Sequence, residues 1–216
     1  MKVRLTLVGC LLIVLATCFV QAGEINKEIR TQAATLYGEQ AKRLKSEISV
    51  IYAYEVSERV KRFCKPWQFY RVGIPVPDEG RSSMTPGVLY YKMAAAEQAL
   101  PLNTSHEIAA FLSGIKAPLA TEEDVRVRIG VFVDLLGGEI ATNMPTRESL
   151  FEQYKNLKPE DWTLVIKETD TGWQIYVPVL VEKFIEHYTG YTLALSREGK
   201  MTLIQHKDLF YYTMYE

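Results

Sequence analysis

The C-terminal quarter of the chain, residues 161–216, constrains the fold most, because it divides into short strands joined by tight turns. Runs rich in β-branched and aromatic residues predict four strands, at 162–167, 173–181, 191–196 and 201–206. The segments between them are TDTG, a turn at Thr189-Gly190, and REGK. Such short links cannot hold a crossover, so neighbouring strands must run antiparallel. The sequence therefore predicts a C-terminal antiparallel meander.

Alternation in the second of these strands predicts which side of the sheet is buried. Residues two apart along a strand share a face, and here one face is wholly apolar. Its members are Trp173, Ile175, Val177, Val179 and Val181. Pro178, which has no N–H to donate, predicts an edge position or a bulge.

Residues 24–63 have apolar or small side chains at spacings of three and four, with charged residues between them. This spacing predicts one long amphipathic helix, or two in line, ending before Pro66. The heptad is not strict, so packing of the helix on a sheet is favoured over a coiled coil. A homodimer formed through this helix is the alternative.

The middle of the chain alternates strand, loop and helix signals. WQFYRVGI predicts a strand over 67–74, and the Pro-, Gly- and Ser-rich stretch over 75–87 predicts an exposed loop. A helix is expected from Pro86 to Pro101, and another from a cap at Ser105 to Gly114. Thr146 is expected to cap a further helix that ends before Pro159.

Residues 125–135 carry two conflicting signals. Apolar residues alternate with polar or small ones, as in a half-buried strand, while Thr121-Glu122-Glu123-Asp124 resembles a helix start. A strand is the interpretation we adopt, because β-branched residues dominate and a helix would place Arg128 beside the apolar stripe. Gly137-Gly138 then predicts a turn.

Helices first and a meander last indicate an α+β fold, with a long N-terminal helix and shorter helices packed on a curved antiparallel sheet. This order of elements resembles the NTF2-like and cystatin-like architectures. The likeness is one of architecture alone and implies nothing about function.

The N-terminal segment MKVRLTLVGCLLIVLATCFVQA has the pattern of a secretory signal. Lys2 and Arg4 precede a long apolar run, and a small residue, Ala22, precedes a polar stretch. We expect export to the periplasm or cell exterior, with cleavage near Ala22. The alternatives are a lipoprotein modified at Cys18 and an uncleaved anchor, although the apolar run is shorter than the roughly 20 residues that span a bilayer.

Cleavage would leave residues 23–216 as a single domain with Cys64 as its one cysteine, which excludes an internal disulfide. Loss of Lys2 and Arg4 takes the basic count from 25 to 23 against 26 acidic residues, so the formal charge moves from −1 to −3. No basic run remains to follow a phosphate backbone, so nucleic acid is not an expected partner. Membrane contact is expected only through an uncleaved or lipidated N-terminus.

The sequence lacks the common catalytic and nucleotide-binding motifs, and no cofactor or metal is expected. His206 and Asp208, two apart near a strand end, could act with His187 as general base and orienting carboxylate. Cys64, as a lone cysteine, is expected to be a buried small hydrophobe. Its place at a helix C-terminus, where the dipole disfavours a thiolate, argues against thiol catalysis.

Aromatic residues and an arginine pair are the candidate binding groups. Adjacent aromatics on a strand point to opposite faces, so some of them are expected at the surface, where Tyr and Trp favour binding. Two arginines on one strand face could clamp a carboxylate or a phosphate. The candidates are Trp67, Tyr70, Arg126, Arg128, Tyr188, Tyr191, Tyr211 and Tyr212.

The leading hypothesis is therefore a non-catalytic exported protein that binds a protein or a small-molecule ligand. The expected contact surface combines the 75–87 loop with the C-terminal tyrosines. The alternative is an envelope hydrolase that uses the His187, His206 and Asp208 groups in a sheet-lined pocket.

Overall fold

The computed structural model describes residues 31–39, 42, 50–53, 55–65, 67–73, 75–78, 81–84, 88–93, 100–142, 158–182 and 186–212. These residues belong to two compact units. One unit takes its members from residues 1–55 and 66–101, and the other from 56–65 and 102–216. The expected signal segment and the helix predicted after Thr146 lie outside the described residues. The single domain over 23–216 stays a prediction.

The described part of the first unit contains a helix over 31–39 and a four-stranded sheet, in which β1 with β2 and β2 with β5 pair antiparallel. Ala33 and Tyr37, one helical turn apart, are buried. The strand order is β1-β2-β5-β6, with β1 at Val50–Ala53, β2 at Trp67–Gly73, β5 at Val88–Met93 and β6 at Leu100–Leu102. A separate hairpin joins β3 (Pro75–Asp78) and β4 (Arg81–Met84).

Three predictions for this unit are wrong. The range 24–63, predicted as one long helix or two in line, is helical at 31–39 and 58–63 but contains β1, which pairs antiparallel with β2. The 75–87 loop contains the β3–β4 hairpin, and the helix expected from Pro86 contains β5. The sequences of β1 and β5, VIYA and VLYYKM, are rich in strand-forming residues. Pairing with β2 therefore overrides the helical spacing of the apolar positions. The strand predicted over 67–74 is confirmed as β2.

In the described part of the second unit there are three α-helices, each with a side-chain cap, and a 3-10 helix, η2, at Pro159–Trp162. The α-helices are α2 (Glu58–Phe63), α3 (Ser105–Gly114) and α4 (Glu122–Leu135). The Ser57 hydroxyl accepts the Val60 N–H at the start of α2. Thr104, one residue before the cap that the sequence suggested, forms a capping box with Glu107 on α3. These caps satisfy N–H groups that have no partner inside the helix.

The strand predicted over 125–135 is wrong, because these residues belong to α4. Thr121 Oγ1 accepts the Asp124 N–H at 3.2 Å, and the Asp124 carboxylate accepts the Thr121 N–H at 2.8 Å. The carboxylate also accepts the Thr121 hydroxyl and the Ala120 N–H, and these bonds, the hydroxyl's first, hold the pKa of Asp124 below its usual range. Three acidic residues in the first turn also stabilise the helix, because their negative charges interact favourably with the positive end of its dipole. The helix start thus outweighs the β-branched residues that follow it. The turn at Gly137, where φ is +74°, is confirmed.

The sheet of the second unit confirms the predicted meander. Its order is β11-β10-β9-β7, and β8 pairs with the same edge of β9 as β7. The bounds are β7 Glu139–Ile140, β8 Val165–Thr169, β9 Gly172–Glu182, β10 Glu186–Ser196 and β11 Met201–Tyr212. The turn expected at Thr189-Gly190 is wrong, because both residues lie inside β10.

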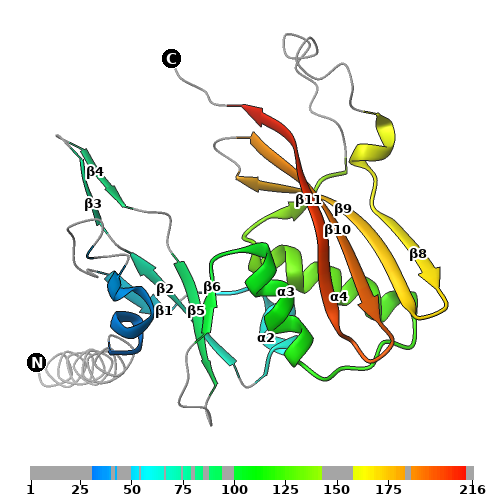
Figure 1. Ribbon diagram of the computed structural model, residues 1–216, viewed down its shortest axis with the longest axis horizontal. Coiled ribbons are helices and arrows are strands. Elements are labelled where there is room, and N and C mark those ends of the chain that lie inside the picture. Colours follow the sequence, from blue (N-terminus) through cyan, green and yellow to red (C-terminus); the bar gives the residue numbers. More distant parts are fainter. Residues whose placement is uncertain are drawn as a thin grey trace, which may run out of the picture. The chain divides into compact units, whose positions relative to one another are not determined.

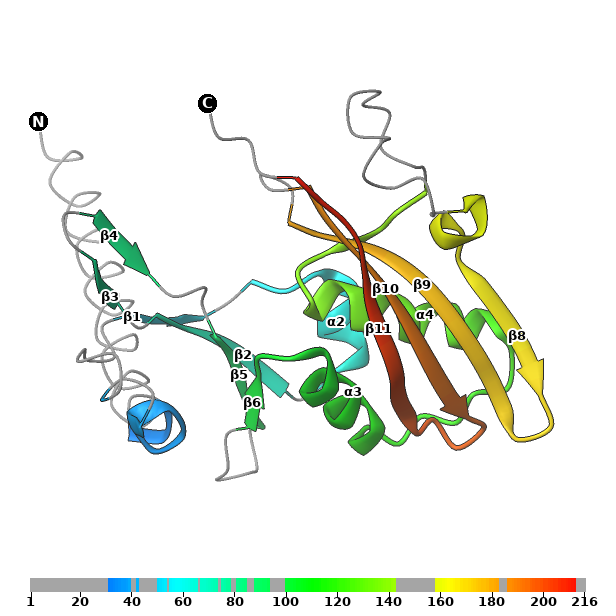
Figure 2. The same ribbon diagram turned by 45° about the horizontal axis from the view of Figure 1, so that its top comes forward.

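Among the residues that the structure describes, helices cover one face of this sheet and leave most of the other uncovered (Figures 1 and 2). Beneath the helices lie the alternate apolar residues predicted for β9 and their counterparts on β10 and β11. The buried members are Trp173, Ile175, Val177, Val179, Tyr191, Leu193, Leu195, Met201 and Leu203. The Phe132 ring of α4 meets the Tyr191 ring edge-on at 5.6 Å between centroids. The α+β class with a curved antiparallel sheet is therefore confirmed.

Pro178 lies between the stretch of β9 that pairs with β8 and the stretch that pairs with β7. Its carbonyl accepts the Ala141 N–H at 2.9 Å, on the side of β9 away from β10. A residue in a strand directs its N–H and C=O to the same side. The missing N–H of Pro178 therefore faces the β7 side, and pairing with β10 at Gly190 is undisturbed. The local edge position predicted from the sequence accounts for this proline.

Candidate functional site

The uncovered face of the second sheet carries a groove along β10. On this face β10 presents four small residues in turn: Gly190, Thr192, Ala194 and Ser196. Larger side chains stand on either side at the same level. Gln174 of β9 and Thr202 of β11 both pair with Ala194. A row of small residues between two taller ones leaves a trough along the middle strand.

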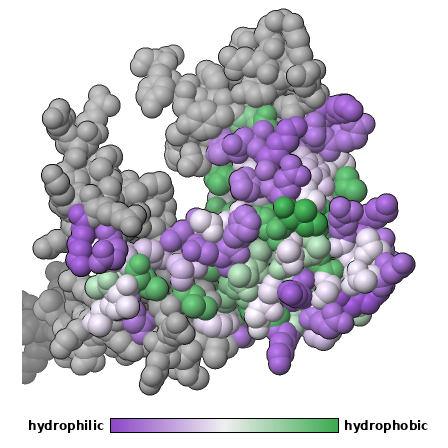
Figure 3. Space-filling model, in the orientation of Figure 1, coloured by the Kyte–Doolittle hydropathy of each residue, from purple (hydrophilic) through white to green (hydrophobic). Residues whose placement is uncertain are grey.

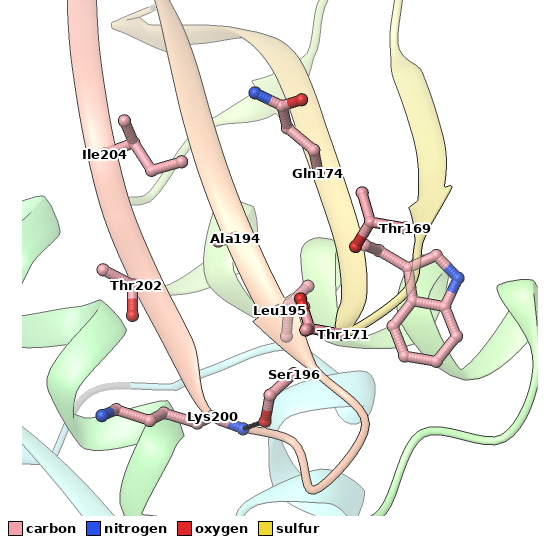
Figure 4. A pocket seen from close by; sticks show the side chains of 10 residues that line it. Thr169, Thr171, Gln174, Ala194, Leu195, Ser196, Lys200, Thr202 and Ile204 are labelled. Carbon is pink, nitrogen blue, oxygen red and sulfur yellow. Dashed lines mark hydrogen bonds between the residues drawn. The ribbon is translucent and has the colours of Figure 1, made fainter.

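The groove encloses about 380 Å³ and opens near the β8–β9 and β10–β11 turns (Figure 4). Its lining comes from four adjacent strands and from those turns: Thr169, Thr171, Trp173, Gln174, Ala194, Leu195, Ser196, Lys200, Thr202 and Ile204. Ile204 is 56 % exposed. In the space-filling view, hydrophobic surface lies among hydrophilic residues over the middle of this sheet (Figure 3).

Hydroxyl and amide groups dominate the polar part of the lining, and Lys200 is its one charged residue. The Ser196 hydroxyl accepts the Lys200 N–H at 3.2 Å. It also hydrogen-bonds the Glu198 carboxyl group, which lowers the pKa of Glu198. The turn beside the groove therefore places opposite charges, on Glu198 and Lys200, two residues apart. Arg197, the third charged residue of this turn, forms an ion pair with Glu168 at 2.7 Å, so the charges around the turn balance and we expect little net field in the groove.

Tyr176, which pairs with Thr192, lies farther along β9 from that turn and beyond the residues that line the groove. A side chain at Gly190 would clash with the Tyr176 ring and hydroxyl, so the absence of a Cβ lets the ring lie over the glycine. The Tyr176 hydroxyl donates to the Asp161 carbonyl at 2.9 Å. Burial raises the pKa of Tyr176 to about 12, so it keeps its proton at neutral pH. Beyond it, Trp162 packs edge-on against Tyr188.

The predicted catalytic residues lie on the opposite, helix-covered side of β10 and β11. His187 Nε2 is 3.2 Å from Asp208 Oδ1, and Thr189 Oγ1 is 3.3 Å from the same oxygen. His206 pairs across the strands with Tyr191, and its ring meets that of His106 edge-on at 6.3 Å between centroids. The structure thus joins His187 to Asp208 and places His206 beside a different histidine.

This arrangement differs from a nucleophile–histidine–carboxylate relay. In a relay the carboxylate and the nucleophile bind opposite ring nitrogens. Here Asp208 and the Thr189 hydroxyl both lie near Nε2 of His187, at 3.2 and 3.5 Å. Among the residues that the structure describes, no group of three or more His, Cys, Asp and Glu side chains could hold a metal ion.

The predicted arginine pair is not formed, because Arg126 and Arg128 lie on a helix and not on a strand. Two residues along a helix correspond to about 200° of rotation, so the side chains point apart. Arg126 is exposed and forms an ion pair with Glu122 at 2.6 Å. Arg128 has no exposed surface. A helix over these residues places Arg128 beside the apolar stripe, and this was the reason to prefer a strand. The structure has the helix and that placement of Arg128.

Arg128 is buried with backbone carbonyls as its hydrogen-bond acceptors. Nη1 donates to the Leu112 carbonyl at 2.7 Å, and both Nη atoms lie within 3.3 Å of the Ile115 carbonyl. Nη2 also donates to the carbonyls of Ala117 and Gly199, at 3.2 and 3.0 Å. The guanidinium therefore ties the end of α3, the following loop and the β10–β11 turn together. This role is structural.

Cys64 lies beside Arg128 and is 1 % exposed. Burial raises the pKa of its thiol to about 12, although the positive charge of Arg128 acts in the opposite direction. At neutral pH the group is a protonated thiol that water does not reach. The expectation of a buried, unreactive cysteine at the end of α2 is consistent with this position.

Aromatic candidates from the sequence are distributed between core and surface. Tyr70 and Tyr191 are buried, at 6 % exposure each. Trp67 and Tyr188 are half-buried, and the Tyr188 ring packs between Trp162 and Phe210. The side chains of Tyr211 and Tyr212 lie outside the described residues.

Sequence reasoning missed the groove residues, although a signal for them was present. In GYTLALS, residues 190–196, the large residues at alternate positions are typical of a buried strand face. The intervening positions are all small. A run of small side chains between bulkier neighbouring strands is the pattern that predicts a trough. Finding it required the register of β9 and β11, which the sequence alone does not supply.

Among the helices that the structure describes, none is long and apolar enough to cross a membrane. No protein-family model, curated protein or solved structure matches this chain.

Proposed function

We propose that this chain is an exported, non-catalytic binding protein, and that the groove along β10 is its binding site. One observation carries the proposal: the uncovered sheet face holds a preformed groove of about 380 Å³ lined by apolar, hydroxyl and amide groups. Ligand sites are typically concave and mostly apolar, with a few converging polar groups. The contact surface thus moves from the 75–87 segment to the C-terminal sheet.

A fragment screen tests the proposal without knowledge of the ligand. A few hundred small non-sugar fragments are added to isotope-labelled protein, and amide shifts are recorded by NMR. We expect the hits to cluster at Gln174, Ala194 and Thr202. Ala194→Trp, which fills the trough, should abolish these shifts, whereas Arg126→Trp on the exposed side of α4 should not. Fragments that shift amides only outside the groove, or groove shifts that persist in Ala194→Trp, would contradict the proposal.

Export is part of the same proposal and has its own test. The basic start, apolar run and small residue at 22 support cleavage near Ala22. Intact-mass measurement on the protein from the envelope or medium should give a chain that begins near Gly23. A mass that begins at Met1, or one that includes lipid on Cys18, would contradict cleavage.

A hydrolase is the second candidate, favoured by the 3.2 Å contact between His187 and Asp208. It would require the His187 ring to use its other nitrogen for the substrate or for water. The test is turnover of a simple activated ester by the wild-type protein and by Asp208→Asn. Hydrolysis above the buffer rate that disappears in Asp208→Asn would favour this candidate over the binding protein. If both proteins hydrolyse the ester only at the buffer rate, the hydrolase candidate is contradicted.

A further inference from the structure

We infer that the groove binds an uncharged oligosaccharide, which extends from the groove along β10 toward Tyr176. The inference rests on the proposed binding function and names the ligand class for the same site. Four features support it: the polar groups of the walls, the charge at the mouth, the aromatic ring of Tyr176 farther along β9, and the position of the groove on a sheet face.

The walls offer groups that can donate and accept at once. Thr169, Thr171 and Thr202 contribute hydroxyl groups, and Gln174 contributes a planar amide. Each hydroxyl or amide both donates and accepts hydrogen bonds, as each sugar hydroxyl does. These groups stand on both sides of the small residues of β10 (Figure 4). The hydroxyl groups of a chain of sugar rings can therefore form hydrogen bonds with both walls.

The charges at the mouth of the groove favour neither an anionic nor a cationic ligand. Lys200 is exposed and forms no ion pair with any residue in the described ranges. Glu198, in the same turn, carries the opposite charge. On the walls themselves the polar residues are neutral. An anionic ligand would meet a lysine and a carboxylate close together, so its charge would gain little.

Tyr176 supplies an aromatic surface beside Thr192, beyond the residues that line the groove. Its ring lies over Gly190 and the residue is half-buried, so part of the ring remains accessible. The hydroxyl is already bonded to the Asp161 carbonyl, which fixes the ring in place. Aromatic rings with an apolar face suit ligands that are apolar on one side and polar at the rim. From Gly190 to Ser196 the strand runs about 20 Å, which is long enough for several sugar rings.

The position of the groove disfavours an extended peptide. Peptides that bind sheets gain affinity from main-chain hydrogen bonds to an exposed edge strand. The floor of this groove is β10, an inner strand whose backbone groups pair with β9 and β11. Only side chains face the ligand. A ligand whose own hydroxyl groups carry the recognition fits this surface better.

Titration of the full mature protein with defined oligosaccharides tests the inference. The probes are cellotetraose, chitotetraose and maltotetraose, with tetragalacturonate and an acidic decapeptide as the alternative classes. We expect at least one uncharged tetrasaccharide to shift the amides of Gln174, Ala194 and Thr202 in a saturable way. Binding of only the acidic sugar or the peptide would overturn the inference, as would binding of none. If the non-sugar fragments still cluster in the groove, the proposed binding function stands while the inference fails.

Two variants and a matched control locate the contact. Gln174→Leu removes the wall amide at nearly constant volume and should weaken binding about tenfold. Gln68→Leu changes an exposed glutamine of β2, in the other unit, and should leave affinity within about twofold. If Gln174→Leu loses its folded NMR spectrum, Thr202→Val replaces it, with the same expected loss. Equal affinity of the groove variant and the control would contradict the assignment.

Discussion

Arg128 shows at the scale of one residue how a charge can be buried without a carboxylate partner. Its guanidinium group bonds carbonyl oxygens from three separate segments, and the Phe63 ring lies 4.7 Å from its central carbon. Carbonyl dipoles and an aromatic face replace the water that the ion has lost. The residue thereby joins α3, α4 and the β10–β11 turn.

Arg128→Met should lower the free energy of unfolding by about 3 kcal/mol, because several buried carbonyl groups lose their donor. Arg126→Met, two residues away on the exposed side of α4, should change it by no more than about 0.5 kcal/mol. Urea denaturation of both variants measures the difference. Similar small losses in the two variants would show that the Arg128 contacts contribute little.

Cys64 should make stability depend on pH only in the alkaline range. Below pH 9 the thiol is protonated in both folded and unfolded chains. Between about 9 and 12 the unfolded chain loses this proton while the folded chain keeps it, so stability falls as pH rises. We expect a steeper loss of unfolding free energy over this range in the wild type than in Cys64→Ala. Parallel curves would contradict the burial of the thiol.

At the scale of elements, the β10–β11 turn depends on a glycine that serves two purposes. Gly199 has φ of +88°, and a Cβ there would meet Arg128 and the Ala117 carbonyl. The turn therefore needs both the left-handed conformation and the empty space. Gly114, the last residue of α3, has no heavy atom near its absent Cβ.

Gly199→Ala should destabilise the protein by about 2 kcal/mol or more, through backbone strain and displacement of Arg128. Gly114→Ala, by contrast, should be neutral or slightly stabilising, because alanine suits a helix better than glycine. Thermal unfolding of both variants by circular dichroism provides the comparison. Equal melting temperatures of the two variants would mean that the β10–β11 turn accommodates a Cβ at position 199 without strain.

Helix α4 shows why an element can be misassigned from its own residues. Val125, Val127, Ile129, Val131 and Val133 alternate as they would in a strand. The capping box at Thr121 and Asp124 selects the helix locally, and burial of Arg128 among carbonyls makes it acceptable in the core. The acceptors of Arg128 lie as far away as Gly199, so the deciding contact is not visible in the local sequence.

At the scale of the molecule, α2 is separated from its partners along the chain. It lies between β1 and β2 in sequence but belongs to the C-terminal unit. Ser57 donates to Asp134 of α4 at 2.5 Å, and Arg59 pairs with the same carboxylate at 3.3 Å. Gly130 of α4 leaves room for the Arg59 side chain.

Native-state hydrogen exchange should therefore assign α2 to the same opening unit as α4. We expect the amides of 58–63 and 122–135 to converge on one opening free energy as denaturant is added. The amides of β2, which follow within a few residues of α2, are the internal control and should follow a different isotherm. If α2 exchanges with β2 instead, the contacts at Asp134 are not stable in solution.

The sequence by itself determined the C-terminal meander, the buried face of β9 and the local edge at Pro178. These features follow from turn length, alternation and the missing proline N–H, which act between near neighbours. The tertiary structure decided the rest. It made strands of residues 50–53 and 88–93 by pairing them with β2, placed Arg128 in the core, and left one sheet face open. The groove exists because three strands meet in one register, and that register depends on contacts between residues far apart in the chain.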